Sequence, residues 1–143
     1  MIILDANLLL YAYNSSFEQH PRAKSWLERT LVALEPVGLP WATILAFLRT
    51  GTNPRAFPNP LKPEEAAAIV SEWLAHPIVV TVEPGDRHWE ILTALLLATQ
   101  ARGSRVMDAH LAAITIEHGA TLCTTDRDFR LFAGLRTLNP LEN

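Results

Sequence analysis

The sequence predicts an α/β fold in which helices cover both faces of a mostly parallel sheet. Short apolar segments, some rich in β-branched residues, alternate along the chain with longer segments whose apolar residues recur at helical spacing. Strands that alternate with helices in this way are typical of βαβ units, in which successive strands run parallel. The chain has no repeat, low-complexity tract or linker, so we expect a single domain over residues 1–143.

The N-terminal third begins with a predicted strand at 2–4, an apolar run that ends at Asp5. A helix should follow through 8–13, where apolar residues on all sides indicate burial. A second helix is predicted over 20–34, because its apolar residues fall on one helical face. These residues are Ala23, Trp26, Leu27, Leu31 and Leu34.

The middle of the chain predicts a short strand at 37–40 and a helix over 41–50 that stops near Gly51. Proline recurs around 55–60, which indicates a loop. Pro63 and the two glutamates after it begin the next helix, which runs to about residue 76, because proline and acidic residues suit a first helical turn.

The last part of the chain begins with 78–82, the clearest β-branched strand in the sequence. Asp86 is expected to cap a helix that extends to about residue 100 and is interrupted at 103–105. The next helix is predicted over 107–117 and ends before a glycine. The final elements are a strand at 121–125, a short helix at 126–132 and a strand at 135–138.

Composition limits the compartment and the class of partner. The single cysteine, Cys123, permits no internal disulfide, and the longest apolar run, 94–98, is too short to span a bilayer. The N-terminus lacks the basic region of a signal peptide, so we expect a cytoplasmic protein with no membrane partner. The net charge of −3 argues against an extensively basic surface, although ten of the twelve cations are arginines, which suit phosphate recognition.

Four of the five aspartates follow predicted strands or begin predicted helices: Asp5, Asp108, Asp126 and Asp128. Ligands of open α/β sheets bind beyond the carboxyl ends of the strands, so these side chains are candidates for one site. Helix capping, worth about 1 kcal/mol, explains Asp108 and Asp126 equally well, and Asp128 also fits a solvent-facing first turn. Asp5 is harder to explain structurally, because an unpaired carboxylate behind a buried strand costs several kcal/mol.

A cluster of these carboxylates predicts a divalent cation. Two carboxylates about 4 Å apart repel by roughly 4 kcal/mol at an effective dielectric constant near 20, so several cannot stay ionised together without a counter-ion. Oxygen ligands without histidine or thiolate indicate Mg²⁺ or Mn²⁺ rather than zinc. Such an ion binds phosphate oxygens and activates water, so phosphodiester hydrolysis is the expected reaction.

Three segments, in this order, resemble the motifs of PIN domains and, more narrowly, of VapC toxins from bacterial type II toxin–antitoxin systems. These segments are 5–7, 108–113 and 124–129. Parts of 47–61 and the Pro140-Leu141 pair resemble one VapC subfamily, so the likeness covers nearly the whole chain. The resemblance implies a three-layer α/β/α fold, an Mg²⁺- or Mn²⁺-dependent endoribonuclease (a hydrolase of EC class 3.1), a homodimer, an RNA substrate and a cognate antitoxin.

The resemblance also implies a role for individual residues. Asp5, Asp108 and Asp126 would be the metal ligands and, with Asp128, the catalytic set; Asp128 would support the metal or hold a second ion. Thr124 or Thr125 would position a carboxylate or a water molecule, and Asn7 would hydrogen-bond to the site. From their places in the chain, Arg49, Arg105 and Arg127 are candidate phosphate contacts, while Arg49 is explained equally well as a surface arginine.

One position departs from the family pattern. Many PIN domains have a glutamate on the helix after the second strand, where this chain has Ala46, and no acidic residue lies between Glu35 and Glu64. The departure indicates one metal ion rather than two, or weak binding in the absence of RNA. It also keeps open a non-catalytic PIN-like module that only binds RNA or protein.

A second alternative is a phosphotransfer protein with an acidic cluster, such as a haloacid-dehalogenase-like phosphatase or a receiver domain. That phosphatase chemistry needs a second aspartate two residues after the first, where this chain has Asn7. The only lysines, Lys24 and Lys62, lie too early in the chain for the role that the class requires. Both points disfavour this alternative.

Overall fold

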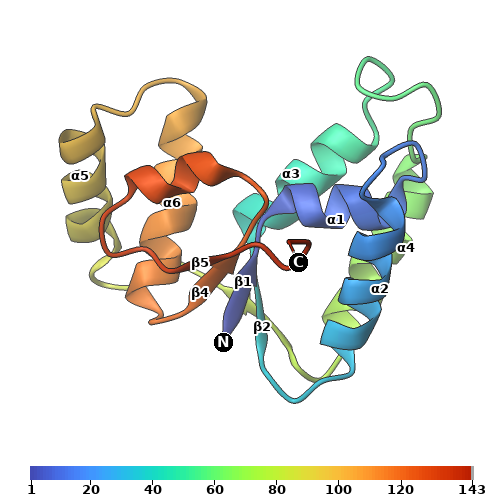
Figure 1. Ribbon diagram of the computed structural model, residues 1–143, viewed down its shortest axis with the longest axis horizontal. Helices are drawn as coiled ribbons and strands as arrows, with labels where there is room; N and C mark the ends of the chain where they lie inside the picture. Colours follow the sequence, from blue (N-terminus) through green and yellow to red (C-terminus); the bar gives the residue numbers. More distant parts are fainter. Residues whose placement is uncertain (143) are drawn as a thin grey trace.

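The fold, described over residues 1–142 by a computed structural model, is a single five-stranded sheet between two layers of helices (Figure 1). All four strand pairings are parallel, so the described sheet is wholly rather than mostly parallel. The strands are β1 (Ile2–Leu4), β2 (Val37–Pro40), β3 (Val79–Val82), β4 (Thr121–Cys123) and β5 (Thr137–Leu138). The helices are α1 (Ala6–Tyr13), α2 (His20–Leu31), α3 (Trp41–Gly51), α4 (Pro63–Ala75), α5 (His88–Thr99), α6 (Ser104–Glu117) and the 3₁₀ helix η1 (Arg127–Leu131).

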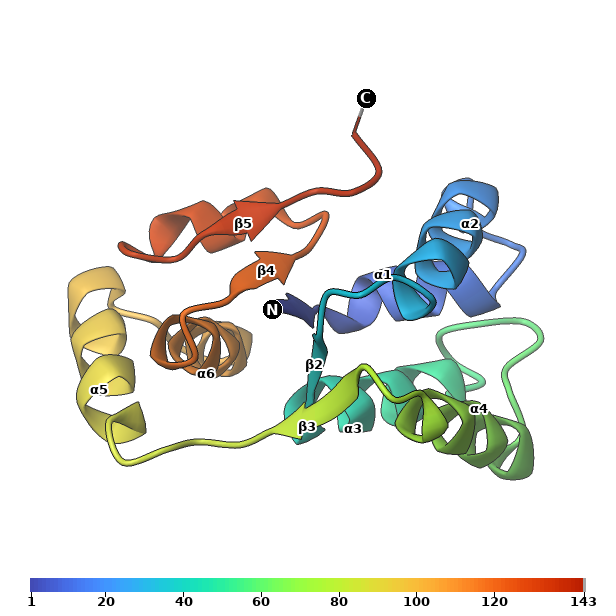
Figure 2. The same cartoon turned by 90° about the horizontal axis from the view of Figure 1, so that it is seen from below.

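Each face of the sheet has its own hydrophobic core, because successive strand residues point to opposite faces. Ile3 packs with α5, α6 and η1, whereas the next residue, Leu4, packs with α1 to α4. Leu122 and Cys123 of β4 divide in the same way. Figure 2 shows the result, with α5 and α6 on one side of the strands and α1 to α4 on the other.

The strand order β3-β2-β1-β4-β5 creates one switch point, between β1 and β4. The chain builds outward from β1 through β2 to β3, and then crosses back to place β4 on the other side of β1. Leu4 is in register with Cys123, and the Asp5 amide donates to the Cys123 carbonyl at 3.0 Å. Asp5 therefore leaves the sheet at the point where α/β folds leave a crevice for ligands.

The structure corrects two predicted helix boundaries. The second helix ends at Leu31 rather than at 34, and Leu34 is 95% exposed rather than part of the buried face. The sixth helix begins at Ser104, immediately after Gly103, whose φ of +58° ends the preceding loop. Asp108 consequently lies in the second turn of α6 and not in the first, so it cannot be an N-terminal cap.

The predicted Asp86 cap is wrong. The N-cap of α5 is Arg87, and the carboxylate that meets this end of the helix belongs to Glu117, at the end of α6. Glu117 accepts hydrogen bonds from the backbone amides of Gly85 and Arg87, at 2.8 and 2.9 Å. A Cβ at Gly85 would lie 2.6 Å from the Glu117 carboxylate, so glycine permits this close approach.

Two further features of the fold concern Cys123 and the lengths of the helices. Cys123 is fully buried in β4, and burial raises the pKa of its thiol to about 12, which suits a core residue rather than a nucleophile. Within residues 1–142, no helix combines the length and the apolar character that crossing a membrane requires.

Candidate active site

A cleft of about 490 Å³ opens at the carboxyl ends of β1 and β4. Asp5, Asp108 and Asp126 line it together, although they come from the end of β1, from α6 and from the segment after β4. The structure thus brings together three of the four predicted carboxylates. Of the other predicted site residues, Asn7 and Arg49 also line the cleft.

Asp5 is the most enclosed of these carboxylates. Its backbone is extended, with φ −79° and ψ 147°, and the residue directly precedes α1. Its Oδ2 accepts a hydrogen bond from Thr124 Oγ1 at 2.7 Å. Burial raises the pKa of Asp5, and repulsion from Asp108 and Asp126 adds to this shift, while the hydrogen bond from Thr124 opposes it.

Thr124 links two of the acidic side chains. It is 3% exposed, and its Oγ1 also accepts a hydrogen bond from the Asp126 amide at 3.0 Å. One hydroxyl therefore fixes the orientation of Asp5 and the backbone position of Asp126. Thr125 does not line the cleft; it borders a hollow of only about 20 Å³ on the other side of Asp126.

Asp108 faces the cleft from the second turn of α6. Burial raises the pKa of Asp108, repulsion from Asp126 adds to the shift, and the nearby Arg105 guanidinium opposes it. The upward pKa shifts of Asp5 and Asp108 have the same two causes, so the three carboxylates of the cleft share one electrostatic environment.

Asp126 caps η1, which confirms the capping role that the sequence offered as an alternative explanation for this aspartate. Its Oδ1 accepts a hydrogen bond from the Asp128 amide at 2.8 Å. Capping uses one carboxylate oxygen, so it does not conflict with a place in the cleft.

Asp128 does not line the cleft. Its side chain is 61% exposed, and its Oδ2 accepts a hydrogen bond from Arg105 Nη2 at 2.9 Å. Two predicted phosphate contacts are engaged in ion pairs, Arg105 with Asp128 and Arg127 with Glu142 at 3.6 Å. Arg49 is the predicted phosphate contact that lies on the cleft wall.

Thr43 and Ser104 are polar residues of the site that had not been selected from the sequence. Thr43, 3% exposed on α3, donates to the Leu4 carbonyl at 2.8 Å and so fixes α3 against the residue before Asp5. Ser104 lines the cleft at the start of α6. Nothing distinguished either residue in the sequence, because each role depends on a distant segment. Ala46 also lines the cleft, at the position where the family resemblance leads us to expect a glutamate.

The chemistry of the cleft fits a hard divalent cation, although its side chains are not arranged as a finished coordination site. Within residues 1–142, no three acidic, histidine or cysteine side chains are grouped closely enough to hold an ion as they stand. The fit comes from the donor set, which is three carboxylates from three segments that repel one another in a partly buried cleft. Such oxygen donors suit Mg²⁺ or Mn²⁺.

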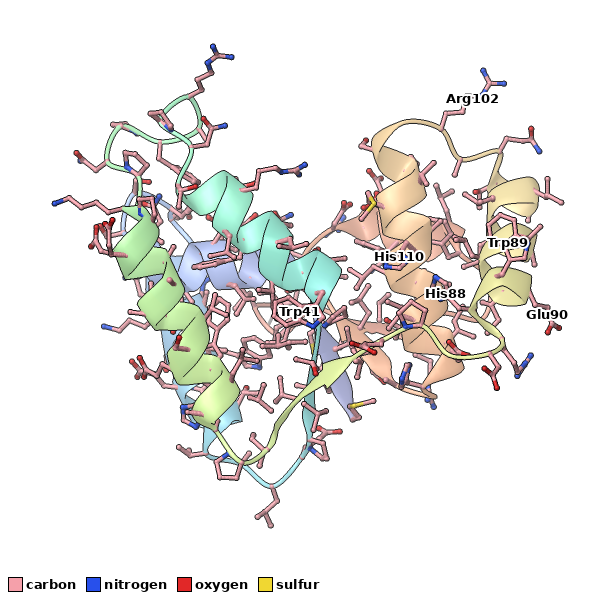
Figure 3. The ribbon with its side chains drawn as sticks, turned by 180° about the vertical axis from the view of Figure 1, so that it is seen from behind. Trp41, His88, Trp89, Glu90, Arg102 and His110 are labelled. Carbon is pink, nitrogen blue, oxygen red and sulfur yellow. The ribbon has the colours of Figure 1, made fainter. Side chains whose placement is uncertain are left out.

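The histidines of α5 and α6 lie outside this donor set. His110 Nδ1 is 3.0 Å from His88 Nε2, and Figure 3 shows the two rings on neighbouring helices. Neither residue lines the cleft. Burial lowers the pKa of His110, and the proximity of His88 lowers it further, so the pair fits a structural role.

Comparison with known proteins gives a consistent result. A family model described as the PIN domain matches residues 2–135. The chain is 42% identical over 140 residues to ribonuclease VapC37 of Mycobacterium tuberculosis, covering 98% of this chain and 97% of that protein. It is 39% identical over 141 residues to ribonuclease VapC33 of the same species, covering 99% of both chains.

Solved structures share the fold at low sequence identity. VapC20 of M. tuberculosis, described as a sarcin-ricin loop cleaving toxin, has a TM-score of 0.69 at 16% identity and covers 95% of this chain and 99% of its own. VapBC2 from Rickettsia felis, solved with a DNA fragment from its promoter, has a TM-score of 0.68 at 19% identity, covering 97% and 98%.

Proposed function

This chain belongs to the PIN domain family, and from that premise we propose that it is a VapC-type toxin, a divalent-metal-dependent endoribonuclease that hydrolyses RNA phosphodiester bonds. The observation that carries the proposal is the convergence of Asp5, Asp108 and Asp126 on one cleft at the switch point of the sheet. Relatives up to 42% identical are named ribonucleases, which supports the ribonuclease activity.

Asp5, Asp108 and Asp126 would hold the Mg²⁺ or Mn²⁺ ion. When bound, such an ion supplies positive charge for phosphate oxygens and lowers the pKa of a water molecule. The protein's own part is to preorganise the ligands: Thr124 orients Asp5, and the hydrogen bonds around Asp126 fix its backbone. Charged groups that are already in position stabilise a transition state more than flexible ones do, because they need no rearrangement during the reaction.

Polar side chains of the cleft wall would bind the phosphates that lie beside the carboxylates. Arg49 lines the cleft from α3 and offers a guanidinium fork for a phosphate. Asn7 lines it from α1 and offers an amide donor. Arg105 pairs with Asp128 outside the cleft, and its positive charge opposes the rise in the pKa of Asp108.

Two protein partners belong to the proposal. A small antitoxin that blocks the cleft is supported by the toxin–antitoxin complexes among the similar structures. A homodimer is supported by the large apolar side chains exposed on α3, α5 and α6, because such surfaces mark protein interfaces. These side chains include Trp41, Leu45, Trp89, Leu97 and Met107, and Figure 3 shows the two tryptophans.

The test is cleavage of total cellular RNA with Mn²⁺, with the cut sites mapped by end sequencing. The wild type should cut at discrete sites, EDTA should stop the cutting, and Asp5→Asn should lose it. Asp86→Asn is the matched control, since Asp86 is an exposed aspartate outside the cleft and should cut like the wild type. A pure wild type that cuts nothing, or Asp5→Asn that cuts equally well, overturns the proposal.

The same experiment decides between the enzyme and a non-catalytic PIN-like module. Ala46 on the cleft wall is the observation that favours the module, because the cleft has one carboxylate fewer than the family pattern. A wild type that binds RNA in a filter assay yet leaves it intact in Mn²⁺ would support the module.

A further inference from the structure

A hollow of about 310 Å³ lies between α2 and the C-terminal segment, residues 139–142. Figure 1 shows this segment leading from β5 toward α2. The lining of the hollow combines two arginines with a hydroxyl group and apolar side chains. It includes Arg22, Ser25, Trp26 and Arg29 of α2, together with Pro140 and Leu141.

Hydrogen bonds hold both guanidinium groups at this hollow. Arg22 Nη1 donates to the Leu141 carbonyl at 2.9 Å, and Arg29 Nη1 donates to Ser25 Oγ at 2.7 Å. Arg29 thus reaches back about one helical turn toward Arg22. Each of these bonds uses one of the five N–H donors that a guanidinium has, so most donors of both arginines remain for a ligand.

No carboxylate neutralises the two arginines within residues 1–142. None of the ion pairs in that range includes Arg22 or Arg29, and no acidic residue lines the hollow. Ser25 Oγ accepts from Arg29 through a lone pair and still has its own hydrogen to donate. The polar side chains of the hollow therefore all offer donors, and two of them are cations. The ligand that they fit is an anionic oxygen group, such as a phosphate.

The hollow lies close to the proposed catalytic carboxylates, because β5 is only two strands away from β1. Leu4 of β1 is in register with Cys123 of β4, and Cys123 is in register with Leu138 of β5. Neighbouring strands lie about 4.8 Å apart, so Leu138 is roughly 10 Å from the residue that precedes Asp5. The C-terminal segment begins directly after Leu138. An RNA strand that passes from the carboxylates over this segment therefore reaches α2.

Two more arginines lie along this route. Arg127 and Arg130 line the small hollow beside Asp126, and Asn139 and Glu142 of the C-terminal segment border the same hollow. That hollow is too small to hold a group of its own, but its arginines add positive charge between Asp126 and α2. Glu142 pairs with Arg127 at 3.6 Å, and both side chains are exposed. Exposed ion pairs are weak, so a phosphate can replace Glu142 as the partner of Arg127.

From this arrangement we propose that Arg22 and Arg29 bind one or two successive phosphates of the RNA strand whose scissile phosphate lies at the carboxylates. Phosphate contacts carry no sequence information, but they fix the position and direction of a strand on a protein. The two arginines would thus guide the RNA across the C-terminal segment into the cleft. The inference rests on the ribonuclease function proposed above and adds a binding site for the part of the substrate that lies beyond the cut.

The repetition of the charges favours RNA over an acidic segment of a protein partner. Arginines recur from the segment after Asp126 to the second turn of α2 and beyond, and the cleft at the start of this route is the proposed place of a phosphate. A nucleic-acid backbone carries one negative charge per nucleotide at regular spacing, so a single strand can meet all of these cations in turn.

Arg29→Gln is the cleaner of two informative variants, because Arg29 bonds within its own helix and does not hold the C-terminal segment. Arg22→Gln is the second. Arg136→Gln is the matched control: Arg136 is exposed and donates to the Gly119 carbonyl at 2.6 Å, as Arg22 donates to that of Leu141. Arg136 precedes β5 and lines none of the hollows described here. Each variant removes one positive charge.

The measurement is fluorescence anisotropy of a labelled oligouridine of about twelve nucleotides, within the range of single-strand site sizes. The protein is titrated in EDTA at several KCl concentrations. Removing one phosphate contact to single-stranded RNA should lower the slope of log Kd against log salt by about 0.7 and raise the Kd at low salt at least about fivefold. Arg22→Gln and Arg29→Gln should each show both effects. Arg29→Lys keeps the charge and should keep the slope, and Arg136→Gln should keep both values.

The outcomes separate this inference from the proposed function. Arg22→Gln and Arg29→Gln with the slope and affinity of the wild type overturn the inference, as do equal losses in all three glutamine variants, which would follow net charge alone. Unchanged RNA binding combined with weaker binding of the cognate antitoxin would assign the hollow to a protein and also overturn it. A wild type that binds RNA through these arginines but cuts none in Mn²⁺ overturns only the nuclease, and one that binds no RNA overturns both.

Discussion

Thr124 Oγ1 lies 2.7 Å from Asp5 Oδ2 and joins residues 119 positions apart in the chain. The same oxygen receives the Asp126 amide, so one buried hydroxyl orients two of the three carboxylates of the cleft. The cleft therefore depends on a residue that does not itself line it. Four predictions follow from the relationships around these carboxylates and the helices that carry them.

Replacing Thr124 by valine should impair both stability and activity. The change leaves the partly buried Asp126 amide without its partner, which costs about 1 kcal/mol or more in the free energy of unfolding. Asp5 also loses its orientation, so RNA cleavage should slow by more than tenfold. Urea denaturation and cleavage rates measure the two effects. Thr124→Ser restores the hydroxyl and should recover both; a serine variant as impaired as the valine variant would contradict the positioning role.

Asp5→Asn should stabilise the metal-free protein at neutral pH. Burial raises the pKa of Asp5 above its ordinary value of 3.8, so in the window above that value the folded state holds a proton that the unfolded state has lost. The contribution of Asp5 to stability is therefore complete below pH 3.8 and is lost as the pH rises through the folded-state pKa.

The measurement is urea denaturation in EDTA between pH 4 and pH 8. Across this range the stability of Asp5→Asn relative to the wild type should increase, whereas the difference between Asp86→Asn and the wild type should stay constant. If the free energy of unfolding changed equally with pH in the wild type and in Asp5→Asn, ionisation of Asp5 would not destabilise the fold. Because an asparagine oxygen can still accept from Thr124, loss of that hydrogen bond does not obscure the result.

Asp128 should matter much less to catalysis than the carboxylates of the cleft. It is exposed and paired with Arg105, so Asp128→Asn should reduce cleavage by less than about tenfold, through loss of one exposed ion pair. Asp108→Asn should reduce cleavage by more than a hundredfold, because it removes a proposed ligand. Parallel rate measurements in Mn²⁺ compare the two variants. Equal losses would place Asp128 within the catalytic set and show that its ion pair opens when RNA binds.

Glu117→Gln should weaken the packing of α5 on α6 in a pH-dependent way. Hydrogen bonds from the Gly85 and Arg87 amides lower the pKa of Glu117, so its stabilisation is complete above its ordinary value of 4.5 and is lost as the pH falls through the folded-state pKa. Urea midpoints of the variant and the wild type should differ at pH 7 and converge as the pH falls through the folded-state pKa of Glu117. Glu90→Gln is the control: Glu90 is exposed and pairs with Arg87 at 3.8 Å, so its removal should show the smaller difference at pH 7.

The order of elements could be predicted because its signals are local. The strand 37–40 was predicted with its observed bounds, and the apolar run before Asp5 placed that carboxylate at a strand end. The start of α6 was predicted too late in the chain. The helix begins at Ser104, directly after Gly103, but Ser104 and Arg105 are polar and show no apolar periodicity that would indicate a helix. The Asp86 cap was wrong because the carboxylate that fills that position comes from Glu117, about thirty residues later.

The sequence by itself determined the donors of the site and the order in which the elements occur, because residue identity, periodicity and strand-end position are properties of short segments. Only the tertiary structure decided which side chains meet, such as Thr124 with Asp5 and Arg105 with Asp128. Such pairings depend on strand order and helix packing, in which many distant apolar contacts act together, so no local pattern records them.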